Sequence, residues 1–212
     1  MGDTGGIGRE IEVKLRLGSF ADYLKLLGFL GQVEYEEHHV NGFFDTEDGL
    51  LAKAGWALRV RSTERGGLIT LKGQPAMLGA AVIREEIEVE IPRGVSNDIL
   101  NLRRDVMSLT VEPVEFVRRK WGDIALAKFV QFENTRQKKQ FRVDDDSLML
   151  ELDKTEFADG TIEYELELEL TEESQVQTVE DRLRRLFVSL NIPFEPNHES
   201  KLQRALMKAG QV

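Results

Sequence analysis

The sequence predicts an α+β fold in which antiparallel strands close into a barrel, with charged side chains inside and helices packed outside. Charged and aliphatic residues alternate along several segments, and successive side chains of a strand point to opposite faces. The charged faces are also segregated by sign, whereas a solvated sheet face usually mixes polar residue types. A closed barrel satisfies both observations because it gathers acidic and basic faces around one bore.

The first predicted strand, 10–17, sets Ile11, Val13 and Leu15 against Glu10, Glu12 and Lys14 on the other face. The same two-residue period recurs in segments 57–62, 68–73, 84–91, 148–154 and 162–170, and segment 132–143 supplies at least one more strand. Four glutamates on one face of 162–170 repel one another unless cations neutralise them. We therefore expect the bore to hold a polyanion through Arg and Lys, and hard divalent cations through carboxylates.

Helices are predicted in four places. Ser19 can cap a helix over 20–30, and the apolar stripe of 176–192 indicates a second that ends before Pro193. A short helix is expected from Ser200, with Leu202 and Leu206 facing inward. Segment 96–126 is expected to be mostly helical, with helix starts at 97–98 and at Pro113.

Composition limits the possible functions. The 212-residue chain carries a net charge of −10, which argues against binding nucleic acid through its overall field. It has no cysteine, which excludes disulfides and thiolate metal sites, and no apolar run long enough to span a bilayer. We expect a cytoplasmic protein with a flexible leader, 1–9, and a single domain, 10–212, that contacts neither nucleic acid nor membrane.

The motif "EIEVK" at 10–14 and the segments that follow it resemble the CYTH superfamily, also called triphosphate tunnel metalloenzymes. The resemblance covers nearly the whole chain and rests on the Glu-x-Glu-x-Lys motif, "NGFFDTEDGLLAKAGWALRVR" at 41–61, "LKG" at 71–73, "FENTR" at 132–136, "LELDKTEF" at 150–157, "YELELEL" at 164–170 and "SKLQRAL" at 200–206. Plant-type and related bacterial tripolyphosphatases look most similar. The resemblance implies an eight-stranded tunnel barrel.

The resemblance also implies a role for individual residues. The implied ligands of Mg²⁺ or Mn²⁺ are Glu10, Glu12, Glu86, Glu88, Asp153, Glu165 and Glu167, and the choice between Glu86 and Glu88 stays open. The implied phosphate ligands are Lys14, Arg59, Arg61, Lys72, Arg84 and Arg136. Direct catalytic roles fall to Glu10, Glu12, Lys14, Glu167 and Lys201.

Three functions follow as hypotheses. The first is metal-dependent hydrolysis of inorganic tripolyphosphate to pyrophosphate and phosphate. The second keeps the tunnel but changes the substrate, as in a thiamine triphosphatase or an adenylyl cyclase. Such a substrate would need an aromatic residue at the tunnel mouth, where Trp56 is the visible candidate, although Trp56 and Trp121 are expected to be packing residues. The third is a non-catalytic polyphosphate-binding module. In each case the partner is a small triphosphate or a polyphosphate anion, and the three histidines are expected to take no part in chemistry.

Overall fold

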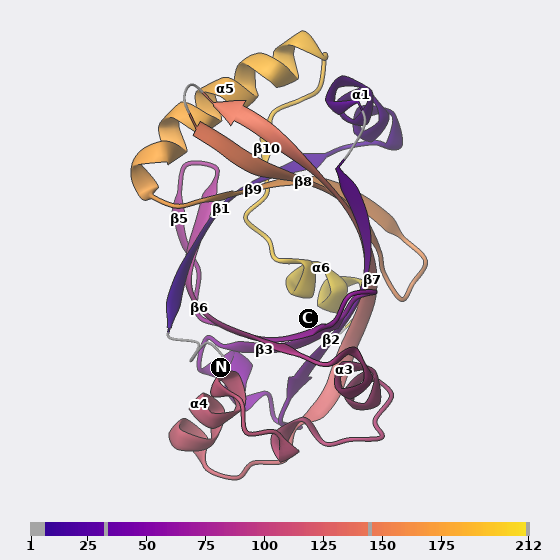
Figure 1. Cartoon of the computed structure of the whole chain (residues 1–212), viewed down its shortest axis with the longest axis vertical. Coiled ribbons are helices and arrows are strands. Elements are labelled where there is room, and N and C mark those ends of the chain that lie inside the picture. Colours follow the sequence, from indigo (N-terminus) through magenta and orange to yellow (C-terminus); the bar gives the residue numbers. More distant parts are fainter. Residues whose placement is uncertain (1–6, 32–33, 144–145, 211–212) are drawn as a thin grey trace.

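The computed structural model describes residues 7–31, 34–143 and 146–210, and its centre is a closed antiparallel barrel (Figure 1). Eight strands form the ring: β1 (Gly8–Leu17), β9 (Ile162–Leu170), β8 (Asp146–Glu156), β7 (Ala127–Val143), β2 (Tyr35–Asp45), β3 (Ala57–Ser62), β4 (Gly67–Lys72) and β6 (Ala81–Ile91). They hydrogen-bond in that order, and β6 pairs with β1 to close the ring. The predicted eight-stranded barrel is confirmed.

The first strand begins two residues earlier than expected. Gly8 and Arg9, assigned above to the leader, pair with Glu86 and Glu85 of β6. Residues 1–6 of the expected leader lie outside the described part of the chain. Pairing with β6 therefore extends the strand beyond the point at which its alternating pattern starts.

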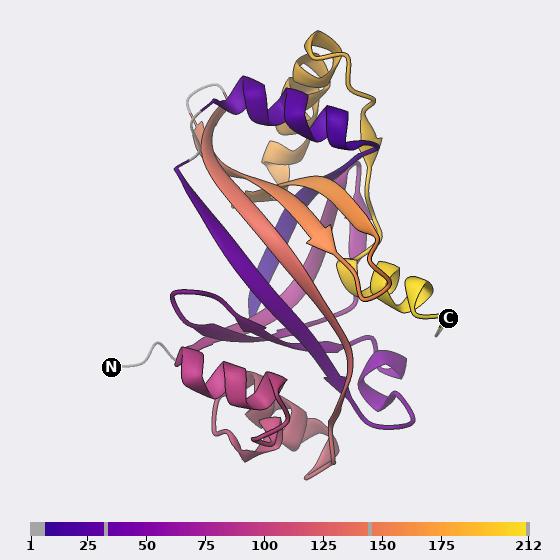
Figure 2. The same cartoon turned by 90° about the vertical axis from the view of Figure 1, so that its right-hand side faces the viewer.

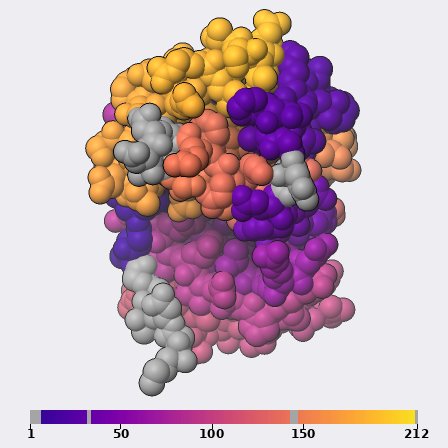
Figure 3. Space-filling model, turned by 45° about the horizontal axis from the view of Figure 1, so that its top comes forward, coloured from indigo at the N-terminus to yellow at the C-terminus, as the bar shows by residue number. Residues whose placement is uncertain are grey.

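The apolar faces of the strands point outward and are covered by helices, as the alternation predicts. In β1, Ile11, Val13 and Leu15 are all buried. They belong to an outer core that joins β1, β8 and β9 to α1 (Phe20–Leu30) and α5 (Val176–Ser189), with Leu26 and Phe187 as contributions from the helices. Figure 3 shows α1 and α5 together covering this side of the barrel.

A second outer core lies on the opposite side. Leu58 of β3, Ile69 of β4 and Ile87 of β6 pack there against Ile99 and Val114. The last two residues belong to α3 (Arg93–Leu100) and α4 (Glu112–Trp121), and the short helices α2 (Leu50–Lys53) and η1 (Val106–Ser108) complete this side. The two cores lie outside the ring, and charged side chains line its interior.

Two predicted helix boundaries differ from the structure and one is confirmed. Helix α3 begins at Arg93, directly after Pro92, rather than at 97–98. The reason is that the Asn97 side chain accepts a hydrogen bond from Ser62 Oγ at 2.7 Å instead of capping a helix. Helix α4 starts at Glu112 with Pro113 in its first turn, as expected, and α5 ends at Ser189, three residues early.

The C-terminal helix α6 (Lys201–Lys208) sits at one end of the barrel (Figure 2). Its N-cap is Ser200, whose side chain accepts from the backbone N–H of Gln203. On its inner side, Ala205 joins a small cluster with Phe43, Phe132 and Phe157. Before it, β10 (Glu195–Pro196) pairs with β1, and β5 (Ala76–Leu78) pairs with β6. The pairing of β10 with β1 and the cluster around Ala205 hold α6 at this end of the barrel.

Among the described helices, none has the length and apolar character needed to cross a bilayer.

Candidate active site

A cavity of about 830 Å³ lies inside the barrel and is lined by side chains of both charges. Twelve of the fourteen residues predicted from the sequence line it: Glu10, Glu12, Lys14, Arg59, Arg61, Lys72, Arg84, Glu86, Glu88, Arg136, Glu167 and Lys201. The other two, Asp153 and Glu165, are almost completely buried behind its wall. The structure therefore gathers the predicted residues around one cavity, although their chemical roles stay predictions.

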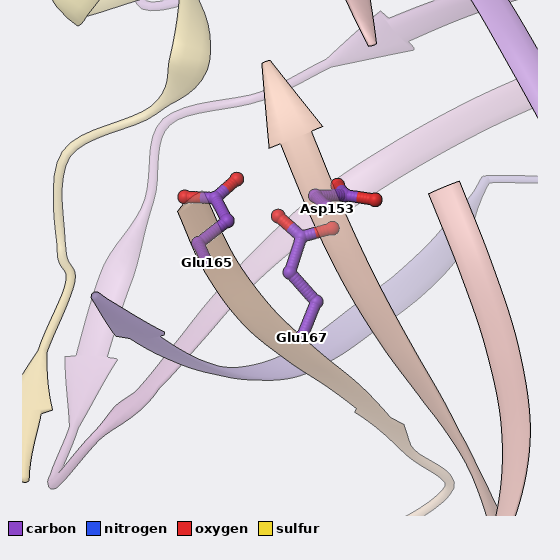
Figure 4. A group of neighbouring side chains, drawn as sticks. All are labelled: Asp153, Glu165 and Glu167. Carbon is purple, nitrogen blue, oxygen red and sulfur yellow. The ribbon is translucent and has the colours of Figure 1, made fainter. Parts of the chain in front are cut away.

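Three carboxylates form an acidic cluster, which we define as Asp153 of β8 with Glu165 and Glu167 of β9. One oxygen from each lies within 4.8 Å of the others, and all three side chains are buried. Figure 4 shows them pointing toward one another from neighbouring strands. The register explains this, because Asp153 pairs directly with Glu165 and the inward-facing Glu167 follows two residues later.

Lys201 enters the acidic cluster from the first turn of α6. Its Nζ lies 2.9 Å from Asp153 Oδ2 and 2.7 Å from Glu167 Oε1, and it also contacts Glu165. Burial lowers the pKa of Lys201, but the three carboxylates outweigh burial and raise the pKa above its ordinary value. The lysine is therefore charged and balances part of the cluster.

Arg136 supplies most of the remaining positive charge. Its guanidinium binds Asp153 with two hydrogen bonds of 2.8 and 2.6 Å, and it also contacts Glu151 and Glu167. Burial raises the pKa values of Asp153 and Glu167, yet Arg136 and Lys201 outweigh burial and hold both below the ordinary range. Arg136 is thus tied to carboxylates here, and its role as a phosphate ligand stays a prediction.

The two glutamates of the first motif differ in their surroundings. Glu10 accepts from Lys72 Nζ at 2.6 Å and from Arg84 Nε at 2.7 Å, and these cations outweigh burial to hold its pKa low. Within the described residues, the ion pairs of Glu12 are those with Lys14 and Arg84, each at 3.8 Å. Burial and the adjacent Glu167 charge raise the pKa of Glu12 to about 8. Glu12 therefore lacks the close cation that Glu10 has.

The residues around Glu12 fit a divalent cation. Lys14 Nζ lies 3.8 Å from Glu12 Oε2 and 3.4 Å from Glu167 Oε1, so it stands between the first motif and the acidic cluster. All the candidate ligand atoms are carboxylate oxygens, the type that Mg²⁺ and Mn²⁺ prefer. Burial first, and then the charge of Glu167, raises the pKa of Glu12, because no cation lies close enough to offset them. A metal ion would supply that missing positive charge.

Glu86 and Glu88 of β6 do not join the acidic cluster. Glu86 lies 3.0 Å from Lys72 Nζ, and Glu88 accepts from Thr70 Oγ1 at 2.6 Å and lies 3.4 Å from Arg59. Both line the cavity near basic side chains instead. A metal at either residue would need a site separate from the acidic cluster.

Arg61 of β3 has no ion pair with any carboxylate in the described residues. Its Nε donates to Asn41 Oδ1 at 2.9 Å. Burial, with the charges of Arg59 and Arg136, lowers the pKa of Arg61 to about 9, because its own charge is left uncompensated. A buried guanidinium that faces a cavity with like charges nearby is suited to an anion.

The neutral polar side chains of the cavity were not identified from the sequence. His39 and Asn41 of β2 are buried and line the cavity, although histidines were expected to take no part in chemistry. They lie four and two residues before Phe43 and therefore share its face of the strand, and this spacing was the available signal. Trp56, the candidate for a contact at the tunnel mouth, does not line this cavity; it packs against Phe116 of α4, at 4.7 Å between ring centroids, as expected of a packing residue.

Comparisons with known proteins agree with this geometry. The family model described as "CYTH domain" matches residues 8–204, nearly the whole described chain. A search of curated proteins gave no match.

Solved structures share the fold over their full length. A candidate adenylyl cyclase from Hippeastrum, described as having a dominant triphosphatase activity, is 28% identical with a TM-score of 0.82, and the match covers 96% of this chain and 97% of that one. A protein described as a candidate adenylate cyclase from Bacillus halodurans is 23% identical (TM-score 0.67, covering 93% and 98%). A protein from Pyrococcus horikoshii is 20% identical (TM-score 0.62, covering 93% and 99%). The last two support the fold alone.

Proposed function

The chain belongs to the CYTH domain family, and from this premise we propose that it is a divalent-metal-dependent triphosphatase that hydrolyses inorganic tripolyphosphate to pyrophosphate and orthophosphate. The observation that carries the proposal is that one cavity combines an uncompensated guanidinium, Arg61, with a carboxylate, Glu12, that lacks a close cation. An anion and a cation bound together would satisfy both. The dominant triphosphatase activity described for the Hippeastrum protein supports the same reaction class.

The protein's own residues divide the work of hydrolysis between two sides of the cavity. Arg59 and Arg61 bind non-bridging phosphate oxygens and stabilise the charge that develops on the transferred phosphoryl group. Lys14, between Glu12 and Glu167, reaches both the carboxylates and a bound phosphate. We propose Glu12 and the acidic cluster as the holders of Mg²⁺ or Mn²⁺. When bound, the ion would neutralise phosphoryl oxygens and lower the pKa of a water molecule.

The remaining predicted residues keep the roles that the family resemblance implies. Lys72, Arg84 and Arg136 are proposed phosphate ligands, and Glu10, Glu86 and Glu88 are proposed as further acidic ligands. Each of these side chains is paired with an opposite charge in the cavity wall. Lys201 is proposed to neutralise the leaving pyrophosphate, because its Nζ already stands among carboxylates at the cavity surface. A bound substrate or metal ion would therefore take the place of one partner in these ion pairs, instead of binding a charge that has no partner.

The direct test is orthophosphate release from tripolyphosphate with Mg²⁺, Mn²⁺ or EDTA. We expect turnover with either metal and none in EDTA. Activity that persists in EDTA would contradict the metal requirement. Binding of tripolyphosphate without any turnover would instead support the non-catalytic polyphosphate-binding module.

A substrate panel separates the related activities. We expect faster turnover of tripolyphosphate than of thiamine triphosphate, ATP or long-chain polyphosphate, because Trp56 lies away from the cavity. Product analysis with ATP distinguishes phosphate release from formation of cyclic AMP and pyrophosphate. If thiamine triphosphate were turned over fastest, or if cyclic AMP were the main product from ATP, tripolyphosphate would not be the preferred substrate.

A further inference from the structure

Glu165 of the acidic cluster is held by two side chains that lie outside the predicted site. Asn197 lies in the segment between β10 and α6, and Arg204 lies in α6. Asn197 Nδ2 donates to Glu165 Oε2 at 2.9 Å, and Arg204 Nη2 donates to the same oxygen at 2.7 Å. All three residues are buried. The two donors therefore meet at a single atom of the acidic cluster.

Both donors come from positions that the fold fixes. Asn197 directly follows β10, and its backbone N–H donates to the carbonyl oxygen of Lys14 in β1 at 2.9 Å. Arg204 Nη1 donates to the carbonyl oxygen of Glu199 at 2.9 Å, which restrains the guanidinium. Because each donor is itself restrained, Oε2 of Glu165 is fixed in place.

The other oxygen of Glu165, Oε1, contacts the ammonium group inside the acidic cluster. Oε1 accepts no hydrogen bond in the described part of the chain, but it contacts Lys201 Nζ, which also contacts Asp153 and Glu167. The ammonium group thus occupies a place for a cation among three carboxylates, and Lys201 also lines the cavity. A metal ion held by the cluster would take that place, and Lys201 would withdraw toward the cavity.

The hydrogen bonds at Oε2 limit what Glu165 can offer to a metal ion. An ionised carboxylate has about two lone-pair sites on each oxygen, and the two donors occupy those of Oε2. Oε1 is therefore the oxygen that stays available. We propose that Asn197 and Arg204 are positioning residues that hold Glu165 as a monodentate ligand and thereby make the acidic cluster select Mg²⁺ over Ca²⁺. This role rests on the metal site of the proposed function.

The number of oxygens that Glu165 offers matters because the two ions differ in what they accept. Ca²⁺ takes about six to eight oxygen ligands in flexible geometry, often with both oxygens of one carboxylate. Mg²⁺ is smaller and requires a nearly octahedral arrangement at shorter distances. A single fixed oxygen suits Mg²⁺, whereas a carboxylate that is free to turn supplies a second oxygen and suits Ca²⁺.

Asn197→Leu is the direct test, because it removes one donor to Oε2 without changing the charge of the site. We expect the affinity for Mg²⁺ to fall about tenfold, while the affinity for Ca²⁺ falls less than about threefold or rises. Calorimetric titration of each ion into the protein without substrate measures both constants. A merely structural role for Asn197 would weaken the binding of both ions equally, and an unchanged ratio of the two affinities would overturn the proposal.

Arg204→Met is the second variant, used if thermal unfolding shows that Asn197→Leu does not fold. It removes the other donor to Oε2 together with one positive charge. Mg²⁺ and Ca²⁺ carry the same charge, so the lost charge changes both affinities alike and their ratio still reports how Glu165 is held. We expect this ratio to shift toward Ca²⁺ by about tenfold, and a constant ratio would again contradict the positioning role.

The matched control is Lys208→Met, on the same helix as Arg204. Lys208 Nζ lies 2.8 Å from Glu163 Oε1, so this variant loses an ion pair between α6 and β9 that does not involve Glu165. The ratio of its Mg²⁺ and Ca²⁺ affinities should equal that of the wild-type protein. A shift as large as that of Asn197→Leu would mean that any loosening of α6 alters the site, and the specific role of the two donors would be lost.

Binding and turnover together separate this role from the proposed function. If the wild-type protein binds Mg²⁺ and hydrolyses tripolyphosphate but Asn197→Leu keeps the wild-type ratio, the positioning role fails and the function stands. If the ratio shifts but no triphosphate is hydrolysed, the positioning role stands and the function fails. A wild-type protein that binds neither ion would remove the metal from the cluster and overturn the positioning role.

Discussion

The acidic cluster and Arg61 face the same cavity, but their charges are balanced in opposite ways. Asp153, Glu165 and Glu167 are each in contact with Arg136, Lys201 or both. Arg61 has an amide oxygen as its partner and a lowered pKa. One side of the cavity is thus stabilised from within the protein, whereas the other is arranged for a ligand. Variants on the two sides should therefore separate stability from activity.

The largest expected effect tests the acidic side as a metal-holding site. Glu167→Gln should lower kcat about 1,000-fold, because it removes a proposed metal ligand and alters a carboxylate that contacts Lys14, Arg136 and Lys201. Orthophosphate release with saturating Mn²⁺ measures it. Glu156→Gln, an exposed glutamate near the end of β8, is the control and should retain full activity. Near-normal turnover in Glu167→Gln would remove Glu167 from the catalytic set.

Arg136→Leu tests whether the acidic side depends on its internal cations. The substitution leaves Asp153, Glu151 and Glu167 with one fewer partner in a buried site, so we expect the free energy of unfolding to fall by about 3–5 kcal/mol. Chemical denaturation without metal measures this loss. Added Mn²⁺ should restore part of it. Unchanged stability would mean that Arg136 is not the structural cation described above.

Arg61→Gln tests the basic side of the cavity, where we expect activity to fall while stability is kept. We expect kcat/KM to fall about 100-fold, because a phosphate ligand is lost, while the free energy of unfolding changes by less than about 1 kcal/mol. The glutamine can still donate to Asn41 Oδ1, which keeps that contact satisfied. A loss of stability as large as that of Arg136→Leu would erase the contrast between the two sides.

The smallest expected effect concerns pH. Glu12 has a pKa raised from 4.5 to about 8, so near neutral pH the metal-free protein binds a proton that a metal must displace. The affinity for Mn²⁺ should rise about fivefold from pH 7 to 8 and about twofold more by pH 9, where it levels off, and calorimetry near pH 7 should detect release of about one proton. Without metal, the folded state binds more protons than the unfolded one between pH 4.5 and 8, so this group lowers stability as pH rises there. An affinity independent of pH would exclude Glu12 as a ligand.

The alternating pattern was sufficient to predict which side chains face inward. It correctly separated Ile11, Val13 and Leu15 from Glu12 and Lys14, because the two faces of a strand follow from sequence parity alone. The family motifs then identified twelve residues that line the cavity. Alternation is enough to identify these residues because the face of each side chain depends only on its position within its own strand.

The pairing between strands could not be predicted in the same way. That Arg136 lies against Asp153 depends on the register of β7 with β8, which no local pattern specifies. The neutral pair on β2 was missed because a histidine and an asparagine carry no charge pattern, and their place in the cavity depends on which strands flank them. Trp56 was expected to pack, but its partner Phe116 could not be predicted, because α4 lies far along the chain from the residue that it covers.

The two outer cores have a consequence for how the molecule unfolds. They lie on opposite sides of a polar interior, and β6 contributes to both, with Ile83 in one and Ile87 in the other. We therefore expect the two halves to unfold as separate cooperative units, joined along the seams between β1 and β6 and between β2 and β7. Amide hydrogen exchange should resolve two classes of protection, one for each half, with β6 as the strand whose opening separates them.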